Sequence, residues 1–247
     1  MIWYNAPMLK AWLKFFRVVN LPTVPGDVLV GAAAVMSANG GMTGLKAPVA
    51  ACVAAVLLYM FGLADNDIVG AKTDVGRPIP DGRISLPVAR IACGLCLFGA
   101  LIVGILANLP PAWWVASFLL ATAIVIYNRT KHPLMMGLCR GLNVLCGGLC
   151  FVTQYRHMQG VPNEGRIELI CLVAVWTAYI TAVTKYSEGE EMDAEKRRRV
   201  GFLIGAIVYL QLIALLVFPV KPFLVAGAVL LIVLRLMKRC LPGVSAS

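Results

Sequence analysis

Residues 65–83 read DNDIVGAKTDVGRPIPDGR and directly continue an apolar run that begins at Ala47. Carboxylates are costly in a bilayer, so acids that extend an apolar helix indicate a functional site. At 100° per residue, Asp67 and Asp74 are nearly two helical turns apart, which predicts both carboxylates on one face, about 10.5 Å apart along the axis. An exposed polar loop is the alternative explanation, and the start of the acids inside the apolar run argues against it.

The second half of this stretch combines a rigid turn with two arginines. Pro78, Pro80 and Gly82 stop the helix, and the turn is expected to carry Arg77 and Arg83 back toward the acidic face. Carboxylates alone would indicate a cation site, whereas carboxylates beside arginines indicate a metal together with an anion such as phosphate. Mg²⁺ fits this combination because it prefers oxygen ligands and is commonly completed by substrate phosphates.

The composition excludes an ordinary water-soluble protein. Of the 247 residues 60% are hydrophobic and 14% are charged, and the mean hydropathy is +0.83. Soluble domains carry about 45–50% apolar and about 25% charged residues. The formal net charge of +10 would suggest a nucleic-acid partner in a soluble protein. In a membrane protein the same excess reflects cytoplasmic loops and anionic lipid headgroups, so no nucleic-acid partner is expected.

Eight stretches are apolar over roughly the 20 residues that a membrane-spanning helix needs, although two of them are short. No soluble-length insert separates these stretches, so residues 1–247 are expected to form a single integral membrane domain, an all-α helical bundle. The expected spans are Lys14–Met36, Ala47–Val69, Leu86–Ala107, Ala112–Tyr127, Leu134–Gln154, Ile167–Lys185, Val200–Phe218 and Pro222–Met237.

The basic residues predict the orientation of the chain in the membrane. Eight spans alternate the loops between two faces, and one face receives both termini and 18 of the 22 Lys and Arg residues. The positive-inside rule therefore predicts that both termini and the acidic loops are cytoplasmic. The expected location is the cell membrane of a bacterium or an archaeon.

A second acidic cluster lies between residues 188 and 195, at the expected cytoplasmic end of the sixth span. Glu188, Glu191 and Glu195 have i, i+3, i+7 spacing, which aligns three carboxylates on one helical face. A second metal site is one explanation. The other is a solvated helical cap, partly balanced by the basic run at 196–199.

These residues resemble the motifs of the UbiA superfamily of intramembrane prenyltransferases. The first family motif is an N-D-x-x-D-x-x-x-D helix end, followed by an R-P-x-P-x-G-R-like loop between the second and third helices. Asn66, Asp67 and Asp74 match it, the Arg-Pro loop matches closely, and Gly70 stands where the middle acid belongs. The second family motif, an aspartate-rich stretch between the sixth and seventh helices, coincides with the glutamates at 188–195.

Weaker matches extend the resemblance over roughly residues 14 to 200. The segment RVVNLPT at 17–23 is similar to the family's first-helix signature, whose asparagine faces the central cavity and is Asn20 here. Asn20 has a second explanation, because it could instead bind backbone groups that Pro22 and the next proline leave free.

The other weak matches lie in the fourth and fifth expected spans. Tyr127 with Arg129 and Lys131 resembles the tyrosine and basic residues that close the fourth family helix, and Arg140 and Asn143 occupy the fifth. Asp27 has no match of this kind. An unpaired charge inside a span costs about 2.5–3.5 kcal/mol on insertion scales, so Asp27 is expected to face the cavity or a basic partner.

The resemblance implies about eight transmembrane helices around a central cavity, and Mg²⁺-dependent transfer of a prenyl group from a polyprenyl diphosphate. Diphosphate leaves, an aromatic or hydroxyl acceptor of unknown identity captures the allylic cation, and the tail reaches membrane lipid through a lateral opening. The implied catalytic residues are Asn66, Asp67, Asp74, Glu188 and Glu191; the implied Mg²⁺ ligands are Asp67, Asp74, Glu188, Glu191 and Glu195. The implied substrate-binding residues are Asn20, Lys72, Arg77, Arg83, Tyr127, Arg129, Lys131, Arg140, Asn143, Lys185 and Tyr186.

Two other functions stay open at this point. Gly70 removes one expected acid, so a catalytically silent relative that binds an isoprenoid is the first alternative. A cation-coupled transporter is the second. Carriers usually place their ion sites near the bilayer midplane, whereas most acids of this chain gather at one membrane face, which argues against a carrier.

Overall fold

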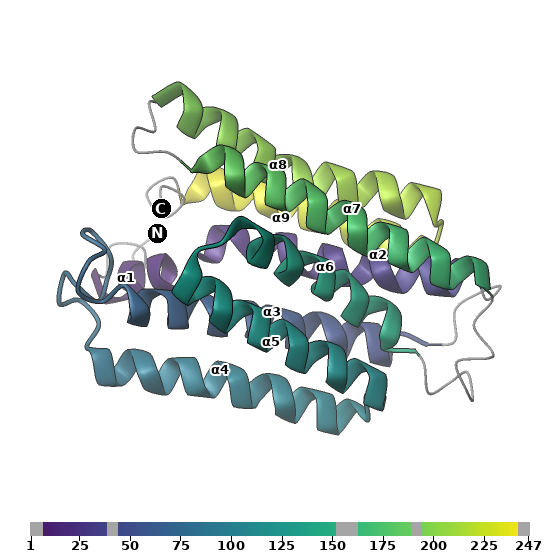
Figure 1. Cartoon of the computed structure of the whole chain (residues 1–247), viewed down its shortest axis with the longest axis horizontal. Helices are drawn as coiled ribbons and strands as arrows, with labels where there is room; N and C mark the ends of the chain where they lie inside the picture. The colour runs from purple at the N-terminus through teal and green to yellow at the C-terminus, as the bar shows by residue number, and fades with distance from the viewer. Residues whose placement is uncertain (1–6, 39–43, 152–162, 189–193, 242–247) are drawn as a thin grey trace.

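A computed structural model describes residues 7–38, 44–151, 163–188 and 194–241, and all regular elements within these ranges are helices. They form an elongated bundle whose long helices run along one axis, with α4 at one edge and α8 at the other (Figure 1). The elements are α1 (Pro7–Phe15), the 3-10 helix η2 (Val18–Asn20), α2 (Thr23–Ala38), α3 (Lys46–Val69), α4 (Leu86–Ala107), α5 (Pro111–Thr130), α6 (Pro133–Leu149), α7 (Asn163–Ser187), α8 (Ala194–Val217) and α9 (Lys221–Cys240).

The first expected span, Lys14–Met36, is interrupted near its start, and the apolar helical segment that could cross a membrane runs over 18–38. α1 ends at Phe15, Arg17 adopts a left-handed backbone conformation with φ 40°, and α2 begins at Thr23. Pro22 explains the restart, because proline lacks the N–H that a helix interior needs but is tolerated where a helix begins. The break brings Arg17 and Asn20 to the wall of an internal cavity.

Within the described ranges, six helical segments are long and apolar enough to cross a membrane: 18–38, 46–69, 86–107, 111–130, 165–187 and 198–217. The expected count of eight included α6 and α9. α6 is apolar but has 17 residues, about 25 Å of helix against a hydrocarbon core of about 30 Å. α9 carries Arg235 as well as Lys238 and Arg239 near its end. The all-α membrane bundle is confirmed, whereas length and composition support six spans.

Two glycines let α2 and α6 approach each other closely. A Cβ on Gly31 of α2 would lie 1.9 Å from the Val144 carbonyl oxygen of α6, and one on Gly147 would lie 2.0 Å from the Val28 carbonyl oxygen. Such contact distances are impossible for any other residue type, so the α2–α6 crossing requires both glycines. Close packing through small residues is the usual way in which helices associate in lipid, where burial of apolar surface gives little driving force.

The outer surface of α4 and α5 is apolar. Leu95, Phe98 and Leu106 of α4, and Val115 and Phe118 of α5, are each more than 60% exposed. An apolar face of this kind is unfavourable in water and suits contact with lipid chains. The other side of α5 contributes Leu120 and Ile124 to the lining of the internal cavity.

Candidate active site

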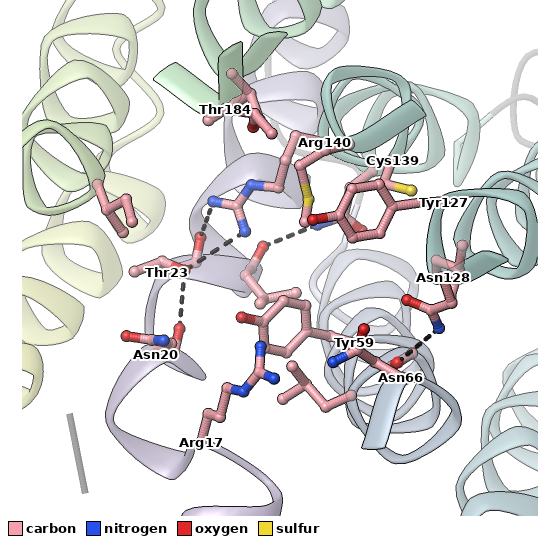
Figure 2. Close-up of a pocket in the computed structure, with 18 of the residues that line it drawn as sticks. Arg17, Asn20, Thr23, Tyr59, Asn66, Tyr127, Asn128, Cys139, Arg140 and Thr184 are labelled. Carbon is pink, nitrogen blue, oxygen red and sulfur yellow. Dashed lines mark hydrogen bonds between the residues drawn. The ribbon is translucent and has the colours of Figure 1, made fainter. Parts of the chain in front are cut away.

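A cavity of about 490 Å³ lies between α2, α3, α5, α6, α7 and α8 (Figure 2). One end is lined by charged and amide side chains from the ends of η2, α3 and α5, and we call this end the cationic mouth. The cationic mouth consists of Arg17, Asn66, Asp74, Arg77 and Lys131. Three basic groups and one acid therefore meet at the entrance to an otherwise largely apolar space.

Asp67 anchors the arginines of the mouth. Its carboxylate is fully buried, and its Oδ1 accepts from Arg17 Nη2 at 3.4 Å and from Arg77 Nη1 at 3.3 Å. Its Oδ2 is buried and has no hydrogen-bond partner within the described ranges. The two arginines come from segments 60 residues apart, and one buried carboxylate holds both because a buried charge must be paired.

Asp74 lines the cavity, but it lies in the turn after α3 and not on α3 itself. α3 ends at Val69, so Asp67 and Asp74 do not share a regular helix and their predicted two-turn spacing was wrong. The Asp74 amide donates to the Gly70 carbonyl at 2.9 Å. A Cβ built on Gly70 would lie 2.4 Å from Asp74 Oδ2. The carboxylate of Asp74 thus occupies the space that a side chain at position 70 would need.

Asp65 belongs to a separate contact outside the cavity lining. It accepts from Arg129 Nη1 and from Asn128 Nδ2, both at 2.8 Å, and so joins the end of α3 to the end of α5. Next to the contacts of Asp65, Lys131 Nζ donates to Asn66 Oδ1. Arg129 was expected to bind substrate, but the structure directs it to Asp65 and leaves it outside the cavity lining.

Two basic groups of the mouth, Arg77 and Lys131, lie outside the spans and have lowered pKa values. Burial lowers the pKa of Arg77, nearby Arg17 lowers it further, and Asp67 and Asp74 act in the opposite direction. Burial also lowers the pKa of Lys131, and the charges of Arg17 and Arg77 contribute to that decrease while Asp74 opposes it. The positive charges repel one another, so an anion at the mouth would relieve this repulsion.

One wall of the interior carries neutral polar groups. Asn20 and Thr23 from η2 and α2 lie near Tyr59 of α3 and Tyr127 of α5, whose hydroxyl groups point into the pocket (Figure 2). The Thr23 hydroxyl donates to the Asn20 carbonyl at 2.8 Å. The side chains of Asn20, Tyr59 and Tyr127 make no hydrogen bond to other residues of the described part. The cavity-facing position expected for Asn20 is therefore observed.

Arg140 belongs to the same wall, but its charge is already paired with Asp27. Arg140 Nε lies 2.9 Å from Asp27 Oδ2, and Arg140 Nη2 donates to Oδ1 at 3.2 Å. Asp27 is 0% exposed and also accepts from Asn143 Nδ2 at 3.3 Å, Trp176 Nε1 at 2.9 Å and Gln211 Nε2 at 2.7 Å. The prediction that Asp27 faces a basic partner is confirmed.

The sequence analysis missed two members of this network, Trp176 and Gln211. Gln211 is a lone amide in the apolar run of α8 and is 2% exposed. A polar side chain in such a position must find a partner, and this is the signal that could have identified it. The network joins α2, α6, α7 and α8 around one carboxylate.

α7 and α8 contribute an aliphatic wall to the cavity. It consists of Ile180, Val183, Val200, Ile204 and Ile207, and Thr184 and Ser187 of α7 also belong to the lining. A ligand in this cavity would therefore meet an anion-binding end, a neutral polar wall and an aliphatic wall.

The second acidic cluster is only partly described. Glu188 is exposed at the end of α7, and Glu195 is exposed and pairs with Arg199 one turn further along α8. Glu191 lies outside the described ranges. Within them, no group of three or more His, Cys, Asp and Glu side chains could hold a metal ion.

Four other expected substrate-binding residues lie on the surface, outside the cavity lining. Lys72 and Lys185 are exposed, and Arg83 pairs with Asp81. Tyr186 stacks beneath Lys196, with Nζ 5.8 Å from its ring centroid. The structure therefore brings Asn20, Arg77, Tyr127, Lys131, Arg140 and Asn143 to the cavity, together with Asn66 and Asp74.

Comparisons with known proteins support the fold. No protein-family model matches the chain, and no curated protein matches its sequence significantly. Among solved structures, digeranylgeranylglyceryl phosphate synthase matches with a TM-score of 0.56 at 17% identity, covering 96% of this chain and 92% of that one. A UbiA homologue from Archaeoglobus fulgidus bound to DMAPP and Mg²⁺ matches with a TM-score of 0.52 at 14% identity, covering 92% and 99%.

The same homologue bound to GPP and Mg²⁺ matches with a TM-score of 0.50, also at 14% identity, covering 96% of this chain and 100% of that one. The matches cover nearly the whole length of each chain. The UbiA-type fold that the motifs implied is therefore confirmed.

Proposed function

We propose that this protein is a UbiA-type prenyltransferase, which moves a prenyl group from a polyprenyl diphosphate to an acceptor within the membrane. The observation that carries the proposal is the union, in one cavity, of an anion-binding mouth and an aliphatic wall. A polyprenyl diphosphate has the same division into a charged head and an apolar tail. The fold supports the proposal, since the similar A. fulgidus structures are bound to DMAPP or GPP together with Mg²⁺.

In this proposal the cationic mouth binds the diphosphate. Arg77 and Lys131 approach from the loops after α3 and α5, and Arg17 approaches from the break before η2. Asp67 keeps the two arginines at the mouth before substrate arrives. Positive groups held in place at the leaving group stabilise the negative charge that develops there, without reorganisation during the reaction.

The acidic groups at the mouth fit a role for Mg²⁺. Asp67 Oδ2 is a buried carboxylate oxygen without a hydrogen-bond partner in the described part, and Asp74 lines the same end of the cavity. Oxygen ligands of this type suit Mg²⁺, which commonly retains water and uses substrate phosphates as further ligands. We assign Asp67 and Asp74 as its ligands from the described part, and Glu188, Glu191 and Glu195 remain candidates for a second position. When bound, Mg²⁺ would neutralise the diphosphate and favour its departure.

The tail and the reacting carbon have separate surroundings in this proposal. The branched side chains of α7 and α8 pack against the prenyl tail, and the rings of Tyr59 and Tyr127 line the same cavity. The face of a tyrosine ring attracts a cation, so both rings can stabilise positive charge on the allylic carbon. The acceptor then captures this carbon and loses its proton.

We also propose that the mouth faces the cytoplasm of a bacterial or archaeal cell. The end of α3, the start of α8 and the end of α9 lie at one end of the bundle (Figure 1). This end includes the basic segments 196–199 and 235–239, which the positive-inside rule assigns to the cytoplasm. A cysteine placed at residue 245 should react with an impermeant maleimide in inverted vesicles but not in intact cells.

A silent protein that binds a prenyl diphosphate without turning it over is the second candidate. It is favoured by Gly70 and by the lack of a three-acid cluster in the described part. Purified protein incubated with radiolabelled geranylgeranyl or farnesyl diphosphate and Mg²⁺ separates the two candidates. Metal-dependent release of diphosphate that is lost in Asp74→Ala supports the enzyme. Tight binding without release, at both chain lengths, supports the silent protein.

A further inference from the structure

The polar wall of the cavity contains one buried cation, and its charge is already neutralised. Arg140 is 8% exposed and lines the cavity beside Thr23 and Asn143. Its Nε and Nη2 lie 2.9 and 3.2 Å from the two carboxylate oxygens of Asp27. The remaining contacts go to Thr23, with Nη2 donating to its carbonyl at 3.1 Å and Nη1 to its hydroxyl at 3.4 Å.

Asp27 has no spare capacity to serve a ligand. Three uncharged donors, from Asn143, Trp176 and Gln211, add to the two contacts from Arg140. These contacts engage both carboxylate oxygens, and the ion pair holds the guanidinium of Arg140 in place. The planar guanidinium therefore cannot offer two parallel N–H groups to an incoming carboxylate or phosphate, which is how arginine usually recognises those anions.

The other polar groups of the wall are neutral, and their side chains are free to form hydrogen bonds as far as the described residues show. Asn20, Tyr59 and Tyr127 line the cavity, and their side chains make no hydrogen bond to residues of the described part. Each of them can both donate and accept a hydrogen bond. The Asn143 side chain contributes an acceptor oxygen that is buried and has no partner in the described part. Groups of this kind match hydroxyl and carbonyl groups.

Resting on the proposed function, we propose that this polar wall binds the acceptor through an uncharged hydroxylic part. Asp27 sets the selectivity, because its carboxylate removes the positive charge that an acidic acceptor would require. The division of charge along the cavity supports this assignment: the anionic end of the donor goes to the cationic mouth, and the described residues that line the rest of the cavity leave no unpaired cation for a second anion. Asp27 is thus a specificity-determining residue that acts through Arg140.

The test uses two small phenols that differ in one group. 4-Hydroxybenzyl alcohol is neutral, and 4-hydroxybenzoate carries a carboxylate on the same ring. Binding is measured by titration calorimetry in phosphatidylcholine nanodiscs, with Mg²⁺ and saturating inorganic diphosphate so that the mouth is occupied. We expect the wild-type protein to prefer the alcohol by about tenfold or more, since burying a carboxylate without a counter-charge carries a desolvation cost that a hydroxymethyl group does not.

Three variants separate selectivity from a purely structural role. Asp27→Asn leaves the charge of Arg140 unpaired, so affinity for 4-hydroxybenzoate should rise about tenfold or more and the preference should reverse. Asp27→Asn combined with Arg140→Gln removes both charges and should restore the preference for the alcohol. Asp65→Asn alters an acid that lies outside the cavity lining and should leave the wild-type preference unchanged.

The proposal is overturned if wild-type protein binds 4-hydroxybenzoate as tightly as the alcohol, if it binds neither phenol, or if Asp27→Asn leaves the ratio unchanged. Should Asp27→Asn fail to fold, the wild-type ratio still decides whether the wall prefers the uncharged ligand. Failure of inorganic diphosphate to bind in the first step would instead contradict the proposed function, so the two failures are distinguishable.

Discussion

Asp27 and Asp67 are both buried carboxylates that pair with arginine, but their surroundings differ sharply. Asp27 receives donors from four side chains, including neutral groups of α7 and α8. Asp67 receives two arginines at 3.3 and 3.4 Å, and its second oxygen has no hydrogen-bond partner in the described part. The saturated carboxylate cross-links the bundle, whereas the unsaturated one lies behind the mouth, buried and outside the cavity lining, where it holds two arginines that line the cavity.

The largest expected effect comes from removing the saturated carboxylate. Asp27→Ala leaves the guanidinium of Arg140 buried without a counter-charge, which costs about 3–5 kcal/mol of folding free energy. Reversible unfolding in mixed micelles by sodium dodecyl sulfate measures this cost. Asp65→Ala, which removes a carboxylate whose arginine is half exposed, is the control and should cost much less. Equal costs for the two variants would contradict the distinction.

Removing the unsaturated carboxylate should affect turnover more than stability. Asp67→Ala frees both arginines of the mouth and removes a candidate Mg²⁺ ligand, so release of diphosphate from geranylgeranyl diphosphate should fall by about 10²–10³-fold. The side chains of Arg17 and Arg77 are 18% and 20% exposed and can turn toward water, which limits the loss of stability. A variant as unstable as Asp27→Ala, with its turnover intact, would reverse the assignment of the two carboxylates.

The basic groups of the mouth should contribute to affinity individually. Arg77→Met and Lys131→Met each remove one charged donor, and each should weaken binding of inorganic diphosphate by about ten- to a hundredfold. Calorimetry at constant ionic strength measures the change. Arg83→Met is the matched control, because Arg83 pairs with Asp81 and lies outside the cavity lining. Comparable losses in all three variants would indicate a diffuse surface charge rather than a built site.

A smaller effect is expected at Gly70. The methyl group in Gly70→Ala would collide with the carboxylate of Asp74 and displace it from the mouth. The Mg²⁺ concentration required for half-maximal turnover should then rise by about tenfold, as is typical when a group supporting a metal ligand is lost. Gly94→Ala provides the control, since a Cβ there has open space. An unchanged Mg²⁺ requirement would remove Asp74 from the metal site.

The sequence indicated the helical bundle and the motif residues, because hydropathy and short spacings are local properties. Asp27 was predicted to have a basic partner because an unpaired charge inside a membrane span is costly, and Arg140 is that partner. Trp176 and Gln211 are 149 and 184 residues from Asp27, and no local pattern relates positions so far apart. The pair that Arg129 makes with Asp65 was not predicted, because motif matching does not reveal which nearby acid a side chain will meet.

The errors around Asp74 and Arg17 have a common cause. Both lie just beyond the end of a helix, where one change of backbone direction moves every later side chain. α3 was extended through Gly70 by its periodicity, and the first span was extended through Arg17 by its hydropathy. Neither periodicity nor hydropathy reveals a left-handed residue or a turn. The sequence could therefore identify residues of the mouth but not how they are arranged.

The most direct test is a structure of the protein with geranylgeranyl thiolodiphosphate and Mg²⁺. We predict that the diphosphate oxygens contact Arg17, Arg77 and Lys131, that Mg²⁺ bridges them to Asp67 and Asp74, and that the tail lies along α7 and α8. The Asp27–Arg140 pair should remain closed and make no contact with the diphosphate. A diphosphate bound to Arg140, or a ligand bound outside this cavity, would contradict the account.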